Sequence, residues 1–412
     1  MKQAAKTQFT EIEGSVAAPK GFTAGGIHCG IRKNRTKRDL ALIACRVPCA
    51  AAAVYTQNKV KGAPILVTRQ NLADGRAQAV ICNSGNANTC NPNGIEVARQ
   101  MCTLAGQALG IAPEDVIIAS TGVIGQPLDT APIAAGLGPL AQSLSKQGGG
   151  LAAEAILTTD LVRKEMAVQF KLGGKTCTLG VIAKGSGMIH PNMATMLGFL
   201  TTDAAITPAL LHKALLASVQ QTYNMVSVDG DTSTNDMVSI LASGLAGNAE
   251  ISREDEDYHT FCDALNRVNH HIAKKMAADG EGATKLLVID VTGAANTAAA
   301  RAVAKSVCTS SLVKAAMFGA DANWGRVLCA IGYAPAEVNI DGVDVFFASS
   351  AGDIQVCKGG RGLPFDEAAA KQVLLQDEIT VRITLQDGEG AATAYGCDLT
   401  YDYVKINGDY RT

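Results

Sequence analysis

The sequence lacks the features that mark membrane proteins and nucleic-acid-binding proteins. Its 412 residues carry 36 basic and 38 acidic side chains, for a net charge of −2, and no basic stripe or acidic tail stands out. This balance gives no support for nucleic acid or a membrane as a partner. The N-terminus has no apolar core of signal-peptide length, and no later run reaches transmembrane length. We therefore expect a cytoplasmic protein.

Recognisable metal and nucleotide motifs are lacking too. Twelve cysteines are scattered along the chain, and the closest pair, Cys45 and Cys49, has no second pair or nearby His that would complete a zinc-ligand spacing. The tripeptide from Gly174 to Thr176 lacks the earlier glycine of a phosphate-binding loop, and no complete dinucleotide fingerprint follows a strand. We expect no metal site, no bound cofactor, and cysteines that are reduced and mostly buried.

The chain is instead rich in glycine and in short apolar runs. It has 42 glycines and only 4% aromatic residues, which suits a tightly turned α/β structure. Apolar runs that end near turn residues predict buried strands in the first half. These strands span 41–45, 64–68, 77–82 and 115–119. Helical spacing predicts helices over 94–110 and 131–145, and alternation around two glycines predicts a hairpin over 166–183.

The second half is predicted to alternate in the same way and to become rich in strands towards its end. Strands are expected directly after residue 195 and over 286–290, 345–348 and 379–385. Helices are expected near 207–222, 254–278, 297–315 and 366–374. The length permits two or three domains, but no linker rich in Ser or Pro marks a boundary.

The most informative run extends from Lys184 to Asp203 and reads KGSGMIHPNMATMLGFLTTD. It places the hydroxyl of Thr195 after a turn rich in Gly and Pro and before an apolar strand. Such a hydroxyl could attack the carbonyl of Ala194 and break the chain, and the freed α-amino group could then activate the same hydroxyl for acyl chemistry. Alternatively, Thr195 is only a β-branched residue that enters a buried strand. Spacing alone does not exclude the second interpretation.

The same run resembles the ornithine acetyltransferase family (ArgJ, the glutamate N-acetyltransferases of arginine biosynthesis), whose precursors cleave themselves at an Ala-Thr bond. The resemblance runs nearly end to end, from GFTAGG at Gly21 to INGDYRT at Thr412. It implies an α/β fold, with a layered α/β/β/α sandwich of the N-terminal-nucleophile type over 1–285 and a smaller C-terminal α/β domain over 286–412 that completes the site. It also implies cleavage into an alpha chain, 1–194, and a beta chain, 195–412.

Three polar segments of the first half are candidates for the site. Thr121 and Gly122 follow a predicted strand, where a polar turn could aim donors at an oxyanion or merely form a turn or cap a helix. Lys184 could bind a substrate carboxylate, stabilise the tetrahedral intermediate, or lie solvated at a strand end. The resemblance implies an oxyanion hole at Thr121 and Gly122 and substrate binding by Lys184 and Thr158. After Asp160 the chain reads LVRK where the family has Thr-x-Pro-Lys.

Three residues of the second half complete the predicted site. Glu281, on a loop flanked by glycines, suits a substrate ammonium group, although an exposed loop acid needs no such role. The resemblance implies substrate binding by Glu281 and by Asn407 and Thr412 in the C-terminal tail, although chain ends usually fray. The polar run 227–236 lacks the closing Glu of a calcium loop, and we interpret it as a hydrogen-bonded scaffold beside the site.

The leading hypothesis is an autoprocessed acetyltransferase that moves an acetyl group from N2-acetylornithine to glutamate through acetyl-Thr195, in ping-pong order. Acetyl-CoA would be a second donor in a bifunctional enzyme, and no residue decides this point. The resemblance implies an α2β2 assembly of the two fragments. The first alternative is a self-cleaving aminopeptidase or amidase, which passes the acyl group to water. The second is an amino-acid-binding protein, which would stay intact.

Overall fold

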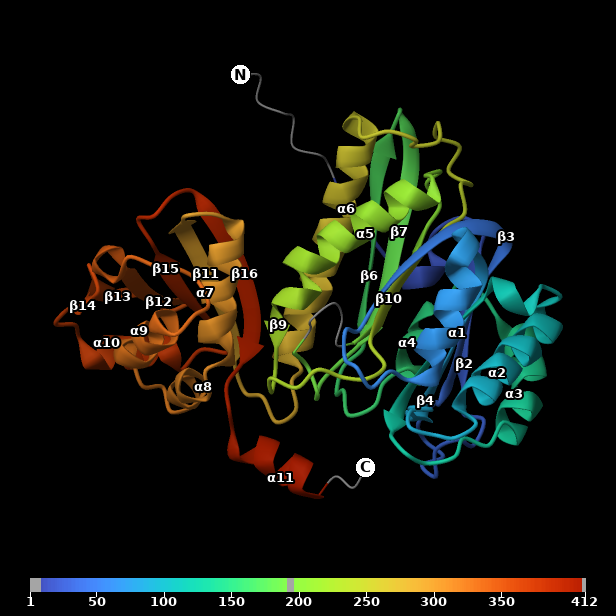
Figure 1. The fold of residues 1–412 in the computed structure, drawn as a ribbon, viewed down its shortest axis with the longest axis horizontal. Coiled ribbons are helices and arrows are strands. Elements are labelled where there is room, and N and C mark those ends of the chain that lie inside the picture. The colour runs from blue at the N-terminus through green and yellow to red at the C-terminus, as the bar shows by residue number, and fades with distance from the viewer. Residues whose placement is uncertain (1–8, 191–195, 410–412) are drawn as a thin grey trace.

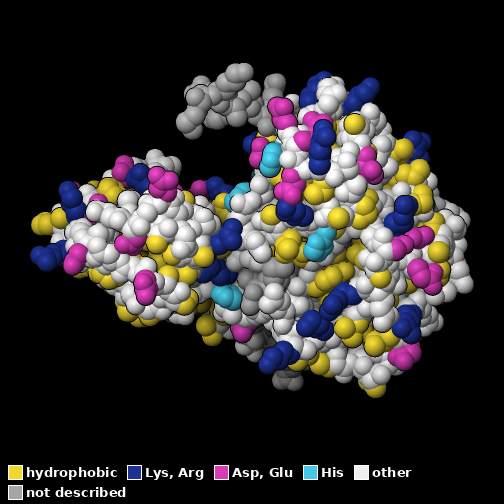
Figure 2. Space-filling model, turned by 45° about the horizontal axis from the view of Figure 1, so that its top comes forward, with side chains coloured by type: hydrophobic (Ala, Val, Ile, Leu, Met, Phe, Trp, Pro, Cys, Tyr) yellow, Lys and Arg dark blue, Asp and Glu magenta, His cyan; other side chains and the backbone are white. Residues whose placement is uncertain are grey.

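The computed structural model describes residues 9–190 and 196–409. Two β-sheets with helices packed on them form two lobes, a larger one built on the first sheet and a smaller one built on the second (Figure 1). On the face shown in Figure 2, basic and acidic side chains are interspersed over both lobes. Within the described ranges, no helix is both long enough and apolar enough to cross a membrane.

The first sheet has nine strands, eight of them in one continuous path, with β2 (Phe22–Ile27) paired to β3 beside that path. The path is β1 (Thr10–Ile12), β6 (Lys164–Leu172), β7 (Lys175–Lys184), β8 (Leu197–Thr202), β10 (Met237–Ala242), β3 (Leu40–Tyr55), β4 (Arg76–Asn86) and β5 (Val116–Val123).

The sheet folds into two layers, and the long strand β3 runs from one layer into the other. Its first half pairs with β2 and β4, its second half pairs with β10, and the register with β4 shifts between Ala44 and Cys49. Such a bulge bends a strand and increases its twist. One buried cluster then joins Ile43 of the first layer to Phe199 and Leu241 of the second. The two layers therefore pack face to face across a shared core.

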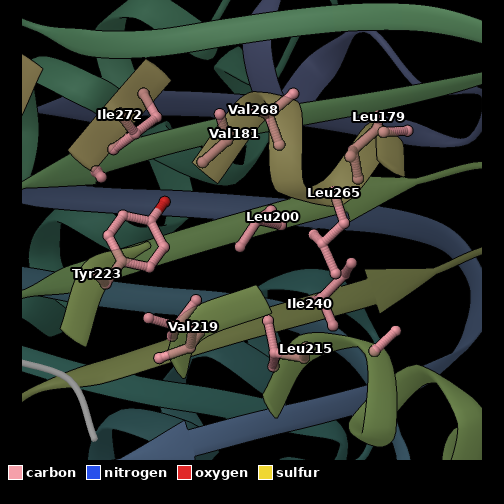
Figure 3. Close-up of a cluster of buried hydrophobic side chains, with 14 of the residues drawn as sticks. Leu179, Val181, Leu200, Leu215, Val219, Tyr223, Ile240, Leu265, Val268 and Ile272 are labelled. Atoms are coloured by element: carbon pink, nitrogen blue, oxygen red, sulfur yellow. The ribbon is translucent and has the colours of Figure 1, made fainter. Parts of the chain in front are cut away.

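Helices cover the outer face of each layer. On β7, β8 and β10, the helices α5 (Pro208–Gln221) and α6 (Glu256–Ala278) bury the side chains drawn in Figure 3. On β4 and β5, three other helices pack over a second outer core: α1 (Ala63–Asn71), α2 (Gly94–Leu109) and α3 (Ala131–Ser143). This arrangement is a layered α/β/β/α sandwich, so the predicted fold class is confirmed.

The second sheet has seven strands and forms the smaller lobe. Their order is β14 (Arg361–Gly362), β13 (Gly352–Lys358), β12 (Asp344–Ser349), β15 (Glu378–Thr384), β11 (Leu286–Ala294), β16 (Gly390–Cys397) and β9 (Val226–Ser227). Four helices share its core: α7 (Thr297–Thr309), α8 (Ser311–Phe318), α9 (Trp324–Gly332) and α10 (Glu367–Leu374). Leu286 and Cys397, on the opposite face, join the core around α6. The domain boundary at residue 285 stays a prediction.

Most predicted elements match the structure within a few residues. The strand predicted over 41–45 is the start of β3, which continues to Tyr55. Two further predictions are wrong. The strand predicted over 64–68 is part of α1, where Pro64 occupies the first turn and Ile65 and Val67 are buried. A short apolar run fits a buried helix as well as a buried strand, and Pro is well placed in the first turn of a helix. The single helix predicted over 297–315 is two helices, because Ser310 ends α7 and its hydroxyl accepts the Val313 N–H at the start of α8.

Candidate active site

A cavity of about 150 Å³ brings together six of the nine predicted site residues. They are Thr121, Gly122, Thr158, Lys184, Glu281 and Asn407. Ala194, Thr195 and Thr412 lie outside the described residues. The six come from five segments that are far apart in the sequence, and the fold alone makes them neighbours. The functional roles assigned to them stay predictions.

Thr121 and Gly122 lie at the end of β5, beside an irregularity in its pairing with β4. The register shifts around Asn86, which is paired with both Thr121 and Val123. Gly122 has a φ of 128°, and a Cβ atom there would lie 2.4 Å from the carbonyl carbon of Gly85. Only glycine fits both the conformation and the space. Thr121 and Gly122 both line the cavity at this irregular end of the β4–β5 ladder.

Lys184 ends β7 and brings a positive charge into the cavity. Its side chain is largely buried, and its Nζ lies 3.4 Å from the Thr121 hydroxyl oxygen. A buried ammonium group is a strong partner for an anion, because water screens the attraction little. The position therefore suits recognition of a carboxylate beside the Thr121–Gly122 turn.

A buried ion cluster of Asp160, Lys164 and Asp279 contacts the segments that carry Thr158 and Lys184. The ammonium of Lys164 is 2.7 Å from Asp160 Oδ1 and 2.5 Å from Asp279 Oδ2, and its side chain is 0% exposed. Asp160 also accepts the backbone N–H groups of Thr158 and Gly185, at 3.1 and 2.7 Å. The cluster thus ties the Thr158 loop to the segment that follows Lys184.

Asp279 connects the same cluster to a third loop. Its carboxylate accepts the N–H groups of Leu161 and Val162, and its carbonyl accepts the Ser186 hydroxyl at 2.7 Å. The two departures from the family sequence at 161 and 163 leave this backbone anchoring intact. Glu281 follows two residues later, and its N–H donates to the Ser186 carbonyl at 3.1 Å.

Burial by itself would raise the pKa of Asp160. The positive charges of Lys184 and Lys164 and the Gly185 N–H outweigh burial and lower that pKa to about 2. Asp160 is therefore a carboxylate throughout the physiological range. Its negative charge stabilises the ammonium of Lys184 in the cavity wall.

Glu281 is held against the loop that follows Lys184 by a close approach to Gly187. A Cβ atom on Gly187 would lie 2.3 Å from the Glu281 carboxyl carbon, so glycine is required for this contact. On its other side, Glu281 Oε2 accepts the side-chain amide of Asn407 at 2.9 Å. Asn407 lies in α11 (Tyr401–Asp409), which runs below the junction of the two lobes (Figure 1). The C-terminal tail therefore reaches the cavity through a helix that was not predicted.

Ser233, Thr234 and Asn235 also line the cavity and were not predicted as site residues. The Asn235 side-chain amide donates to the carbonyls of Ala87, which directly follows β4, and Ser120, which lies within β5. The interpretation of 227–236 as a hydrogen-bonded scaffold therefore describes these contacts. The signal in the sequence was the density of Asn, Asp, Ser and Thr.

Asp236 follows in the same run and carries a buried carboxyl group. Burial raises its pKa well above the ordinary value, although Ser233 and Lys184 act in the opposite direction. The neighbouring Met237 N–H donates to the carbonyl of Met196, the first described residue after Thr195. A buried acid thus lies where β10 meets β8.

Replacing Lys164 by Met should destabilise the protein strongly. The change leaves two buried carboxylates without their counter-ion, which costs about 3–5 kcal/mol. Denaturant unfolding measures the loss, and Lys213→Met is the matched control, because the Lys213–Glu254 pair is solvent-exposed and worth less than about 1 kcal/mol. Equal losses in the two variants would contradict the role of the buried ion cluster.

The stabilising effect of Asp160 should depend on pH. A carboxyl whose folded-state pKa lies below its ordinary value of 3.8 stabilises the fold above that value, and the effect disappears as the pH falls through about 2. The free energy of unfolding of wild type minus that of Asp160→Asn should be constant above about pH 5 and should shrink between about pH 4 and pH 2. A difference that stays constant to pH 2 would show that the charge of Asp160 is not the stabilising element.

Three comparisons with known proteins bear on this site. The model of the ArgJ family matches residues 23–412. The arginine biosynthesis bifunctional protein ArgJ of Symbiobacterium thermophilum is 54% identical over 403 residues, which cover 97% of this chain and 99% of that protein. Its counterpart in Bacillus subtilis is 46% identical over the full length of both. A solved structure of ornithine acetyltransferase complexed with ornithine, from Mycobacterium tuberculosis, is 36% identical, with a TM-score of 0.42, and covers 45% of this chain and all of that one. The match of the family model and the identity to the first two relatives show that the chain belongs to the ArgJ family, as its motifs predict.

Proposed function

We propose that this ArgJ-family enzyme cleaves itself between Ala194 and Thr195 and then moves an acetyl group from N2-acetylornithine to glutamate through Thr195. The observation that carries the proposal is the convergence of six predicted residues from five segments on one cavity. Membership of a family whose relatives are named for arginine biosynthesis supports the same substrates.

Cleavage needs only the chain itself and water. The Thr195 hydroxyl adds to the Ala194 carbonyl, the C–N bond breaks, and an ester joins the two parts while the nitrogen becomes the α-amino group of Thr195. Water then hydrolyses the ester and releases residues 1–194 from residues 195–412. An α-amino group has a pKa of about 7.7–8.0, so it is a suitable base near neutral pH.

Acetyl transfer repeats the same addition with an external carbonyl. The Thr195 oxygen attacks the acetyl carbonyl of N2-acetylornithine while the α-amino group accepts its proton. Negative charge develops on the carbonyl oxygen, and the Thr121 hydroxyl and Gly122 N–H donate hydrogen bonds to it. The amide C–N bond breaks, and ornithine leaves with the transferred proton. Glutamate then attacks acetyl-Thr195 by the same steps in reverse, which yields acetylglutamate and free enzyme.

The charges of the cavity suit the two ends of ornithine. The buried ammonium of Lys184 would bind the α-carboxylate, and Glu281, held by Asn407, would bind the side-chain ammonium. Thr158 and Thr412 would contribute further hydrogen bonds to the substrates. Opposite charges at two fixed points orient the acetyl group between them.

Three further properties belong to the proposal. Acetyl-CoA would serve as a second acetyl donor, because the curated relatives are named as bifunctional. The two fragments would assemble as an α2β2 tetramer in the cytoplasm, as the family resemblance implies. The small-molecule substrates would bind without a metal or a resident cofactor.

Replacing Thr195 by Ala should give one uncut chain that transfers no acetyl group, since both reactions use the same hydroxyl. A denaturing gel shows the cleavage, and acetylglutamate formed from N2-acetylornithine and glutamate measures the transfer. Thr195→Ser is the matched control, because it keeps a hydroxyl and should be cut and partly active.

An Ala variant that is still cut and active would disprove the nucleophile. Free acetate in place of acetylglutamate in the wild-type assay would instead support the aminopeptidase or amidase alternative.

Replacing Gly187 by Ala should weaken substrate binding without unfolding the protein. The added methyl group would overlap the Glu281 carboxylate, which can move only by leaving its present position. We expect the KM for N2-acetylornithine to rise about tenfold or more, since the loss of a charge-assisted hydrogen bond is worth about 1.5–3 kcal/mol. Gly138→Ala is the control, because a Cβ atom at that helical position meets no neighbour within 4 Å. An unchanged KM for N2-acetylornithine would show that Glu281 does not bind the ammonium group of the substrate.

A further inference from the structure

A second cavity of about 430 Å³ adjoins the candidate active site. The two cavities share Gly122, Thr158 and Thr159 as lining residues. The second cavity is bounded on its far side by the loop between β2 and β3, which contributes residues from Ile31 to Lys37. A ligand that extends beyond the predicted oxyanion hole can therefore continue into this space.

The lining of the second cavity is positively charged. Arg32, Lys33 and Lys37 line it, and none of the described lining residues is acidic. They belong to the run RKNRTKR over 32–38, in which five of the seven residues are basic. The near-zero net charge of the whole chain conceals this run, and the expectation that no basic stripe exists is wrong for these residues.

The basic loop has a preformed backbone. Asp39, which is 0% exposed, accepts the N–H groups of Cys29, Gly30 and Arg32 at 2.7, 3.2 and 3.0 Å. The Arg32 guanidinium donates to the carbonyl of Leu157, next to Thr158. These contacts hold the loop against the rim of the candidate active site, so little ordering is needed when a ligand binds.

The two lysines of the loop are available to a ligand. Arg38 forms an ion pair with Glu154, with 3.1 Å between Nε and Oε2. Lys33 and Lys37 are exposed and form no ion pair with any described residue. Asn34 and Gln126 add amide groups to the lining. Cations and amide donors around an open cavity fit phosphate groups, which offer several strong acceptor oxygens.

We propose that this second cavity binds the phosphate groups of a nucleotide-bearing acetyl thioester, acetyl-CoA, whose acetyl end reaches the candidate active site past Thr158 and Gly122. This inference rests on the proposed function, because it locates the second acetyl donor. The Thr195 oxygen would attack the thioester carbonyl, the C–S bond would break, and the thiol would leave with the proton of the Thr195 hydroxyl. N2-acetylornithine carries no phosphate and does not need this cavity.

The test compares two thioester donors that differ in their phosphates. In the double variant Lys33→Gln/Lys37→Gln, the KM for acetyl-CoA should rise about three- to tenfold, as expected for two solvent-exposed charge contacts. The KM for S-acetylpantetheine, which lacks the nucleotide and its phosphates, should change less than about twofold. Lys171→Gln/Lys175→Gln is the control, because it removes the same charge from the exposed hairpin between β6 and β7 and should change neither value.

The outcomes separate this proposal from the proposed function. Acetyl transfer from N2-acetylornithine to glutamate, measured in the same preparations, tests the proposed function alone. If that reaction proceeds and wild type does not use acetyl-CoA, or if both thioesters respond equally to the double variant, the second cavity is not a phosphate site. A salt titration of wild type gives an independent measure, because added salt should raise the KM for acetyl-CoA more than that for S-acetylpantetheine.

Discussion

The ammonium group of Lys164 is shared between the buried carboxylates of Asp160 and Asp279, and this contact joins three loops that would otherwise be independent. One loop carries Thr158, one follows Lys184, and one carries Glu281. Buried ion pairs add little net stability relative to apolar packing, but breaking one is costly. The cluster therefore favours one relative arrangement of the loops. This arrangement fixes where Lys184 and Glu281 lie in the candidate active site. Since Asp160 stays ionised, the ammonium of Lys184 also has a compensating charge beside it.

The second constraint on the candidate active site is the close packing of neighbouring atoms against two glycines, Gly122 and Gly187. The bulge between β4 and β5 places Gly122 where a side chain would collide with Gly85, and Gly187 leaves room for the carboxylate of Glu281. Gly122 lies near the end of β5, Gly187 follows the end of β7, and both line the candidate active site. In the proposed mechanism, Thr121 and Gly122 are donors that are in place before the substrate arrives and need no reorganisation as charge develops. The second cavity shares Gly122, Thr158 and Thr159 with this site, so in the proposed mechanism a single nucleophile could serve donors of different size.

Elements that depend on neighbouring residues could be predicted from the sequence, because their turn residues and apolar spacing are local. Alternation and turn residues predicted the β6–β7 hairpin. The polar turn after a strand left the role of Thr121 and Gly122 open, and the family resemblance assigned them to the site. The pairing of Lys164 with Asp279 could not be predicted, because 115 residues separate the two and no periodicity connects them. The apolar run over 64–68 fits a strand as well as a helix, and Pro64 lies in the first turn of α1. The basic loop was missed because the net charge of the whole chain does not reveal a local cluster of basic residues. The helix α11 was missed because chain ends are usually frayed and seldom pack against the rest of the protein.

The central claim is that Thr195 carries the acetyl group between donor and acceptor. Wild-type protein incubated with N2-acetylornithine in the absence of glutamate, then analysed by intact-mass and peptide mass spectrometry, tests it directly. The account predicts a fragment that begins at Thr195 and carries one acetyl group on that residue, which disappears when glutamate is added. An unbroken 194/195 bond in active protein, or an acetyl group found on another residue, would contradict it.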